Sequence, residues 1–285
     1  KKELPMPAPL GWSAPACMLA SAIMLSACVQ APLVQGSALS SYNDLAPSDG
    51  IITKSRLRVN QAQVLAAKTI NIAPTGFAPT SAPKLTAEQR ALVTNALNRA
   101  MCVSLSDRFE VVSSDQPADL TVRAVVTQAV ETDEVAAGVS AAASIGTRFI
   151  PSPVPIIVPR LPIGLGKLSI EAEAVDPVGK QQAAMIWGRG AQAFLSSPKM
   201  SKAGDAYDLA AAFGDDFATL LVKGKSPFEG FDPSGSIPSF QKINSTLGLA
   251  PKYAVCERYG RAPGIIGFAG GKLGLPPEWT DNGGK

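Results

Sequence analysis

Four residues near the start of the chain have the types and order needed for covalent lipid attachment. Leu25, Ser26 and Ala27 stand directly before Cys28. An enzyme that transfers lipid needs the cysteine thiol as its nucleophile, and the peptidase that cuts before the cysteine needs narrow side chains upstream. The pattern aliphatic, small, small, Cys is the bacterial lipobox. We therefore expect Cys28 to carry acyl chains, palmitate among them, and to become the first residue of the mature protein.

An uncharged and mostly apolar run, Ala16 to Ala27, leads up to this cysteine, with Lys1 and Lys2 upstream. A membrane-spanning helix needs about 20 apolar residues, whereas the core of a signal peptide needs roughly 7–15. The run therefore predicts a signal peptide over residues 1–27. The alternative is a short buried helix with an incidental cysteine, and the polar chain that follows disfavours it.

The residue after Cys28 is Val29. In enteric-type bacteria an Asp at this position favours retention in the inner membrane. Two or more acyl chains are enough for stable anchoring. We therefore expect a lipid-anchored protein of the bacterial cell envelope, at the outer membrane and facing the periplasm.

Two further cysteines, Cys102 and Cys256, are left once Cys17 is removed with the signal peptide and Cys28 is lipidated. The periplasm permits disulfides, so a Cys102–Cys256 bridge is the preferred pairing. The alternative is two free cysteines, with Cys102 a small core residue on a helix. A metal site made of cysteines alone would need ligands closer together in the chain, so we predict none.

Residues for enzymatic chemistry are sparse. The chain has no histidine, which removes Ser/His/Asp and Cys/His nucleophile systems and His-ligated metals. Glu171 and Glu173 lie two apart on one face of a predicted strand and could resemble a catalytic carboxylate pair. We interpret them as solvated charges, because nothing else in the sequence is predicted to converge on them. The expectation is a protein without catalytic residues that is not an enzyme.

Phosphate and nucleic-acid binding are also disfavoured. Gly166-Lys167 and Gly271-Lys272 are each followed by Leu, where a phosphate-binding loop needs Ser or Thr. The net charge is only +3, from 26 basic and 23 acidic residues, and the basic residues form no block of the kind that binds nucleic acid. We predict no cofactor and no nucleic-acid partner.

Hydrophobic periodicity predicts an α+β domain. Apolar and polar residues alternate over 67–73, 108–112 and 120–127, and this pattern favours strands. Ranges 168–175 and 181–191 predict a hairpin, because Asp176-Pro177-Val178-Gly179 between them has the sequence of a tight turn. Helical spacing predicts helices over 85–106 and 205–223. We expect Thr86 and Gln89 to form a capping box on the first helix, and Asp205 or Ser201 to cap the second. The expected fold is a mainly antiparallel sheet with two helices packed on one face, followed by an irregular Gly/Pro-rich C-terminal tail.

The predicted organisation is a signal peptide (1–27), a lipidated N-terminus and tether (28–55), the α+β domain (56–225) and the tail (226–285). Within the domain, residues 135–166 change character. Small residues at 138, 142 and 146 would form one face of a helix that allows close backbone approach, and closely spaced prolines follow. A surface flap or an oligomer contact is one interpretation, and an ordinary long loop with a short helix is the favoured one.

Several stretches resemble a family of bacterial lipoproteins known only as a domain of unknown function. They are "SDGIITKSRLRV", "ADLTVRAVVTQAV", "VPRLPIGLGKLSIEAEAVD" and "PPEWTDNG". The resemblance spans nearly the whole mature chain and implies envelope location and lipidation, but transfers no catalytic residue. The order of elements also looks like that of small α/β domains in other envelope lipoproteins, an analogy of fold alone.

Three functions follow as hypotheses. The first is a non-enzymatic, lipid-anchored binding or structural component that acts through envelope protein partners, with self-association as one form of contact. The second is an accessory lipoprotein of an envelope transport or secretion assembly. The third, an enzyme that uses Ser, Lys or carboxylates, has the least support.

Overall fold

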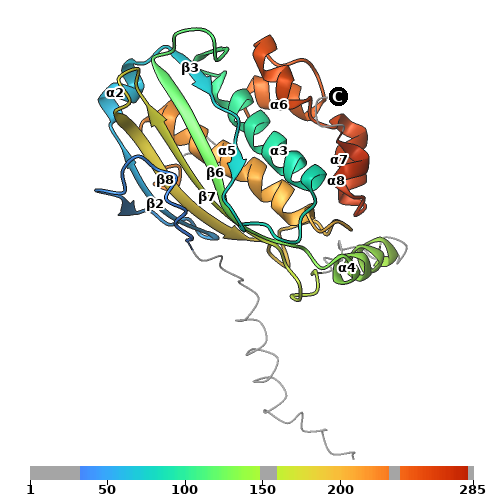
Figure 1. Ribbon diagram of the computed structural model, residues 1–285. Coiled ribbons are helices and arrows are strands. Elements are labelled where there is room, and N and C mark those ends of the chain that lie inside the picture. The colour runs from blue at the N-terminus through green and yellow to red at the C-terminus, as the bar shows by residue number, and fades with distance from the viewer. Residues whose placement is uncertain (1–32, 148–158, 231–237, 282–285) are drawn as a thin grey trace, which may run out of the picture.

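The computed structural model describes residues 33–147, 159–230 and 238–281. The predicted signal peptide, Cys28 and three of the closely spaced prolines, Pro151, Pro153 and Pro155, lie outside these ranges. A single twisted sheet forms the centre of the molecule, with long helices on one of its faces (Figure 1).

In the described residues the sheet has eight strands. Seven follow the order β1 (Ala46–Pro47), β2 (Thr53–Val59), β8 (Gln181–Gly190), β7 (Lys167–Val175), β6 (Leu120–Val130), β3 (Thr69–Ile72) and β5 (Glu110–Val112), and β4 (Gly76–Phe77) also pairs with β6. The pairs from β1 to β6 are antiparallel, whereas β3 pairs in parallel with β5 and β6. The predicted α+β class with a mainly antiparallel sheet is confirmed.

The β7–β8 hairpin forms at the predicted turn. Ala174 pairs with Ala183, and Gly179 takes a φ of +82° that favours glycine. The Asp176 side chain accepts the backbone N–H groups of Val178 and Lys180. This local hydrogen bonding fixes the hairpin register.

Helices α3 (Ala87–Leu105) and α5 (Gly204–Lys223) pack together on one face of the sheet (Figure 1). The predicted capping box of Thr86 and Gln89 is present on α3. Gly214 allows the close approach of the helices, because a Cβ there would lie 2.7 Å from the Leu97 carbonyl oxygen. Aromatic side chains fill the layer between α5 and the sheet, where Trp187 meets the Phe213 ring edge to face.

The predicted side-chain cap of α5 is wrong. Ala203 occupies the N-cap position and makes no side-chain cap hydrogen bond. Asp205 instead forms a buried two-pronged ion pair with Arg160, at 2.6 and 3.1 Å, and accepts the Gly166 N–H. Ser201 accepts the Ala203 N–H and donates to Glu278. The side chains that were expected to cap α5 therefore bind residues that are distant in the sequence: Asp205 binds Arg160, and Ser201 donates to Glu278.

Other short elements were not expected from the sequence. They are β1, β2, β4 and α2 (Gln61–Ala66) in the N-terminal half. Helix α4 (Glu134–Gly146) forms where a long loop with a short helix was the favoured expectation. The tail is more regular than expected, because the described residues 238–281 include α6 (Phe240–Thr246), the 3₁₀ helix η4 (Ala254–Tyr259), α7 (Gly264–Lys272) and α8 (Pro277–Thr280).

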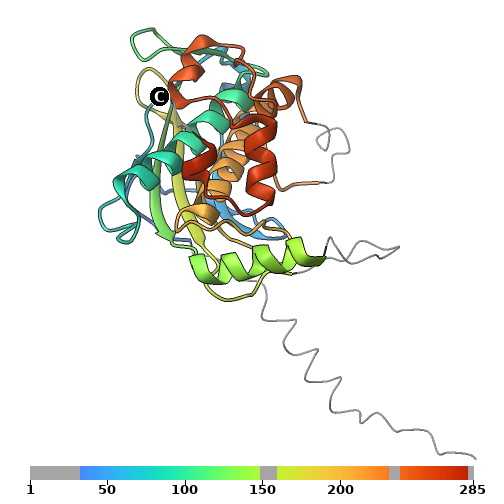
Figure 2. The same cartoon turned by 90° about the vertical axis from the view of Figure 1, so that its right-hand side faces the viewer.

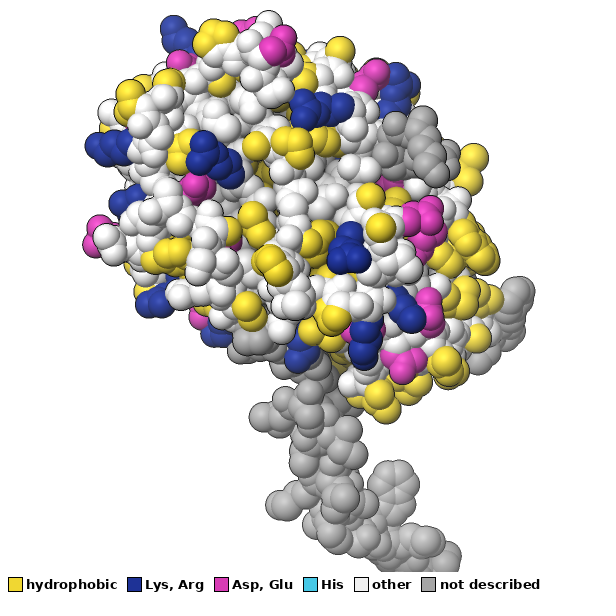
Figure 3. All heavy atoms as spheres, viewed as in Figure 1, with side chains coloured by type: hydrophobic (Ala, Val, Ile, Leu, Met, Phe, Trp, Pro, Cys, Tyr) yellow, Lys and Arg dark blue, Asp and Glu magenta, His cyan; other side chains and the backbone are white. Residues whose placement is uncertain are grey.

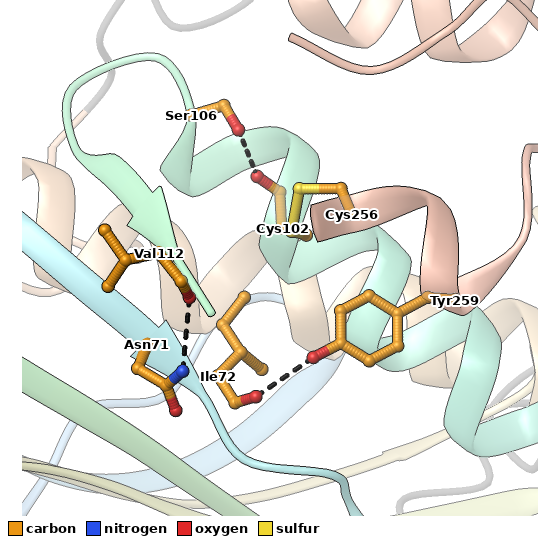
Figure 4. The surroundings of a disulfide bond; sticks show 7 residues. All are labelled: Asn71, Ile72, Cys102, Ser106, Val112, Cys256 and Tyr259. Atoms are coloured by element: carbon orange, nitrogen blue, oxygen red, sulfur yellow. Dashed lines mark hydrogen bonds between the residues drawn. A yellow bond between two sulfur atoms is a disulfide. The ribbon is translucent and has the colours of Figure 1, made fainter. Parts of the chain in front are cut away.

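The tail is attached to the domain by buried contacts. Cys256 in η4 forms a disulfide with Cys102 in α3, and the nearby Tyr259 hydroxyl donates to the Ile72 carbonyl (Figure 4). Asp281 accepts a 2.5 Å hydrogen bond from buried Arg99. Trp279 of α8, by contrast, has an exposed side chain.

Within the ranges given above, the structure contains no helix that combines the length and the apolar character needed to cross a membrane.

Candidate functional site

Residues 33–45, here called the strap, cross the face of the sheet opposite α3 and α5. Leu39 and Leu45 pack on Ala184 and Ile186 of β8, in a small apolar cluster separate from the main core. The alternating neighbours of these β8 residues, such as Met185, belong to the main core instead. The strap therefore covers this face over β7 and β8, whose residues are buried on both sides of the sheet.

Glu171 fixes the first half of the strap. Its carboxylate accepts the backbone N–H groups of Gly36 and Ala38, each at 3.0 Å, and the Tyr42 hydroxyl at 2.7 Å. Burial and the hydrogen bond to Glu171 raise the pKa of Tyr42. The negative charge of the carboxylate is thus compensated by donors from an otherwise irregular segment.

Glu173 fixes the next turn of the strap. It accepts the backbone N–H of Ser40 at 2.8 Å, the Ser40 hydroxyl at 2.6 Å and the side-chain amide of Gln181 at 2.8 Å. Arg123, which is mostly exposed, lies 3.9 Å from the same carboxylate. Glu173 therefore joins the strap, β6 and β8 at one point.

The interpretation of Glu171 and Glu173 as solvated charges is wrong. Their exposed fractions are 0% and 2%. The sequence places them correctly on one strand face, but it gives no sign that the strap donates hydrogen bonds to that face. Because the carboxylates bind the protein's own backbone, their evident role is to hold the strap.

The direction of the strap is set by these contacts. Val34 donates to the Ser169 hydroxyl near the start of β7, and Ser40 reaches Glu173 further along the strand. The strap therefore begins at the end of the sheet where β7 begins and where β6 and β8 end. We call this end the base.

Helix α4 lies across the base, apart from α3 and α5 (Figure 2). Asp133 caps it by accepting the N–H groups of Val135 and Ala136. Two backbone hydrogen bonds attach the flanking segments, from Thr132 to the Lys202 carbonyl and from Asp133 to the Gly164 carbonyl.

The predicted small-residue packing face of α4 is wrong. Ala137, Ser140 and Ala141 are the buried residues, whereas a Cβ at Gly146 would meet nothing within 4 Å. Leu161 donates its N–H to the Ser140 hydroxyl, so α4 packs on the returning chain through this neighbouring face.

Asp216 of α5 is a carboxyl in a mostly apolar setting beside Trp187. Burial raises its pKa from 3.8 to about 6, and this effect outweighs the hydrogen bond that it accepts from the Trp187 indole at 2.9 Å. The neighbouring Arg189 has its pKa lowered by burial. Asp216 lies between α5 and β8, on the face of the sheet opposite the strap.

A pocket of about 510 Å³ opens at the end of the sheet opposite the base. Asp119 in its lining is already hydrogen-bonded within the protein, because its carboxylate accepts the N–H groups of Lys68 and Thr69. These hydrogen bonds lower the pKa of Asp119. Among residues 33–147, 159–230 and 238–281, no cluster of three or more His, Cys, Asp or Glu side chains could hold a metal ion. The carboxylates of Asp119 and Asp176 in this pocket are thus engaged by the protein's own N–H groups.

These features define a class of protein: an α+β domain whose sheet is covered by helices on one face and whose central strands β7 and β8 are covered on the other by the N-terminal strap. The model of the family described as "Protein of unknown function (DUF3313)" matches residues 35–217. The chain belongs to this family. The match includes most of the strap, both glutamates, α4 and most of α5, and the tail lies beyond it.

Solved structures with a similar arrangement include the PelC dodecamer from Paraburkholderia phytofirmans, at 8% identity and a TM-score of 0.36, covering 61% of this chain and 100% of that chain. Another is a Xanthomonas campestris protein assigned to DUF330, at 11% identity and a TM-score of 0.32, covering 55% of this chain and 85% of that chain. These values are too low to support conclusions about function or assembly. No curated protein matches the chain.

Proposed function

We propose that this chain is a lipid-anchored protein of the bacterial cell envelope, held at the outer membrane with its domain in the periplasm, that works through binding or structural contacts rather than catalysis. The observation that carries the proposal is the strap. The strap starts at Leu33, five positions after Cys28 (33 − 28), and an extended chain spans at most about 3.6 Å per residue. A lipid on Cys28 would therefore hold the domain within ~18 Å of the membrane.

Two further observations support this proposal. The Cys102–Cys256 disulfide fits an oxidising compartment such as the periplasm. The carboxylate pair that most resembled a catalytic site is covered by the strap. The proposed contribution of the pair is to fix the anchored segment against the sheet.

The anchor is tested by growth of cells with an alkyne analogue of palmitate, followed by membrane fractionation. The full chain is expected to carry the label and to sediment with outer membranes. Cys28→Ala is expected to lose both properties. Cys17→Ala is the matched control, because this cysteine lies in the predicted signal peptide and should leave labelling intact. A Cys28→Ala protein that still carries label in the membrane would disprove the anchor.

The exposed apolar side chains of the tail favour a second candidate, an accessory lipoprotein of a transport or secretion assembly. Ile265, Ile266, Phe268 and Trp279 are 59–87% exposed, and apolar surface gathered in this way marks protein contacts. A photo-crosslinking amino acid at Ile266, which is 87% exposed, is expected to capture an envelope protein or a second copy of the chain. Val178, also 87% exposed, is the matched control position. Equal crosslinking from both positions would count against this candidate, and light scattering would report self-association.

A further inference from the structure

The base carries exposed apolar side chains on segments that the structure ties together. We call them the basal surface: Val135, Val139, Leu161, Ile163, Phe194 and Leu195, with exposed fractions from 42% to 76%. They come from α4, from the chain that returns after it, and from the loop after β8. Figure 3 shows apolar side chains gathered at the lower right of the molecule, over the position of α4 in Figure 1.

Hydrogen bonds fix these segments relative to one another. The Arg160 N–H binds the Ala193 carbonyl, and the Leu161 N–H binds the Ser140 hydroxyl of α4. The buried Arg160–Asp205 ion pair attaches the same loop to the start of α5. The basal surface is therefore a built part of the domain, and its apolar side chains are presented by a fixed backbone.

The strap starts at the same end of the sheet. The Val34 N–H binds the Ser169 hydroxyl, and Ser169 lies six positions after Ile163 in the chain. The five steps of chain from Cys28 to Leu33 cannot reach further than ~18 Å. A lipid anchor on Cys28 thus brings the base, rather than the opposite end with Val178, toward the bilayer.

We propose that the basal surface lies on the lipid bilayer and inserts its apolar side chains into the interfacial region of the membrane that holds the Cys28 lipid. Exposed apolar side chains at a membrane interface gain free energy in proportion to the apolar area that leaves water. The acyl chains would supply the anchoring, and the basal surface would fix the orientation of the domain. This inference rests on the proposed lipid anchor.

Membrane depth at defined positions tests the orientation. Lipoprotein purified from membranes is reconstituted into vesicles of phosphatidylethanolamine and phosphatidylglycerol, with either plain or brominated acyl chains. In a Trp279→Phe background, Leu195→Trp places a fluorophore on the basal surface and Val139→Trp places a second on α4. Val178→Trp at the opposite end is the matched control. Trp187 is buried and contributes the same background to every variant.

We expect brominated lipids to quench the emission of Leu195→Trp and Val139→Trp and to leave that of Val178→Trp unchanged. Flotation of the protein with vesicles reports the lipid anchor separately. A protein that floats but shows no quenching at Leu195→Trp and Val139→Trp would overturn the membrane contact, and would assign the basal surface to a protein partner or a second copy. A protein that does not float would overturn the anchor, and the inference would fall with it.

Discussion

The carboxylate of Glu171 in β7 accepts the backbone N–H of Gly36 at 3.0 Å, across 135 positions of sequence. This contact joins the segment that follows the predicted lipid anchor to the middle of the sheet. Because the carboxylate is fully buried, its charge is stabilised only by the donors that surround it. The strap and the sheet therefore depend on each other.

Replacing this carboxylate by an amide should loosen the strap. In Glu171→Gln one oxygen becomes an NH₂ group that faces a donor, and a buried unpaired donor costs about 1–3 kcal/mol. Urea unfolding should show a free energy of unfolding lowered by this amount, and proteolysis within residues 33–45 should become faster. Glu110→Gln is the control, since Glu110 is exposed on β5. If both variants unfold at the same urea concentration, the proposed role of Glu171 is wrong.

Gly36 should tolerate no side chain. A Cβ at this position would lie 2.5 Å from the Thr127 methyl carbon, and overpacking of this kind costs about 1–3 kcal/mol. Gly36→Ala is therefore expected to lower the thermal midpoint, whereas Gly76→Ala, with nothing within 4 Å of its Cβ, should leave it nearly unchanged.

A second-site change tests the steric origin of the Gly36 effect. Thr127→Ser removes the methyl group that the added Cβ would strike, so the double variant should recover much of the stability lost in Gly36→Ala. A double-mutant cycle measures this coupling. Additive effects of the two substitutions would mean that the strap does not approach Thr127 as described.

Local signals account for the parts of the fold that could be predicted. The capping box of Thr86 and Gln89 and the turn at Asp176 each lie within four residues, and both form as expected. Strand β2 was not predicted, although its burial alternates: Thr53, Ser55 and Leu57 point to the buried side. Two of these three residues are polar, so the usual apolar alternation is hidden.

Long-range partners account for what could not be predicted. The strap has no periodicity of its own, and its backbone donors find Glu171 and Glu173 about 130 positions later in the chain. Asp205 has the right position to cap α5, but the distant Arg160 takes its carboxylate. In each case a buried charge selects a partner that no short stretch of sequence identifies.

The Cys102–Cys256 bridge should stabilise the attachment of the tail. It joins residues 154 positions apart, and a bridge of this kind typically contributes about 2–4 kcal/mol, mainly by restricting the unfolded chain. Cys102→Ala combined with Cys256→Ala should lower the free energy of unfolding by that amount. The tail should stay docked, because the Arg99–Asp281 ion pair remains.

Mass measurement with and without reductant checks the bridge directly. Protein made in the periplasm should bind a thiol-reactive reagent at Cys102 and Cys256 only after reduction and unfolding. Cys17→Ala, in the predicted signal peptide, should leave this pattern unchanged. Two reactive thiols in unreduced protein would exclude the bridge.

Asp216 should make stability depend on pH in the mildly acidic range. Its pKa rises from 3.8 to about 6 on folding, chiefly through burial. Between these two values the folded state holds a proton that the unfolded state has released, so the free energy of unfolding falls as pH rises and becomes level above about pH 6. Asp216→Asn keeps an acceptor for the Trp187 indole but cannot titrate. Asp216→Asn should therefore remove this pH dependence and raise the free energy of unfolding at neutral pH by about 1–3 kcal/mol. The loss of the attraction between Asp216 and Arg189 reduces this gain.

Thermal unfolding of the wild type and Asp216→Asn across this pH range measures the effect. The difference between the two curves isolates Asp216 from carboxyls with lowered pKa values, such as Asp49 and Asp119, whose stabilisation is lost as pH falls through their folded pKa values. Asp107→Asn, at an exposed position, controls for the loss of one negative charge. Parallel curves for the wild type and Asp216→Asn would show that Asp216 titrates alike in the folded and unfolded states. In that case the Trp187–Asp216 hydrogen bond would join an indole to a carboxylate that stays charged at pH values well above 3.8.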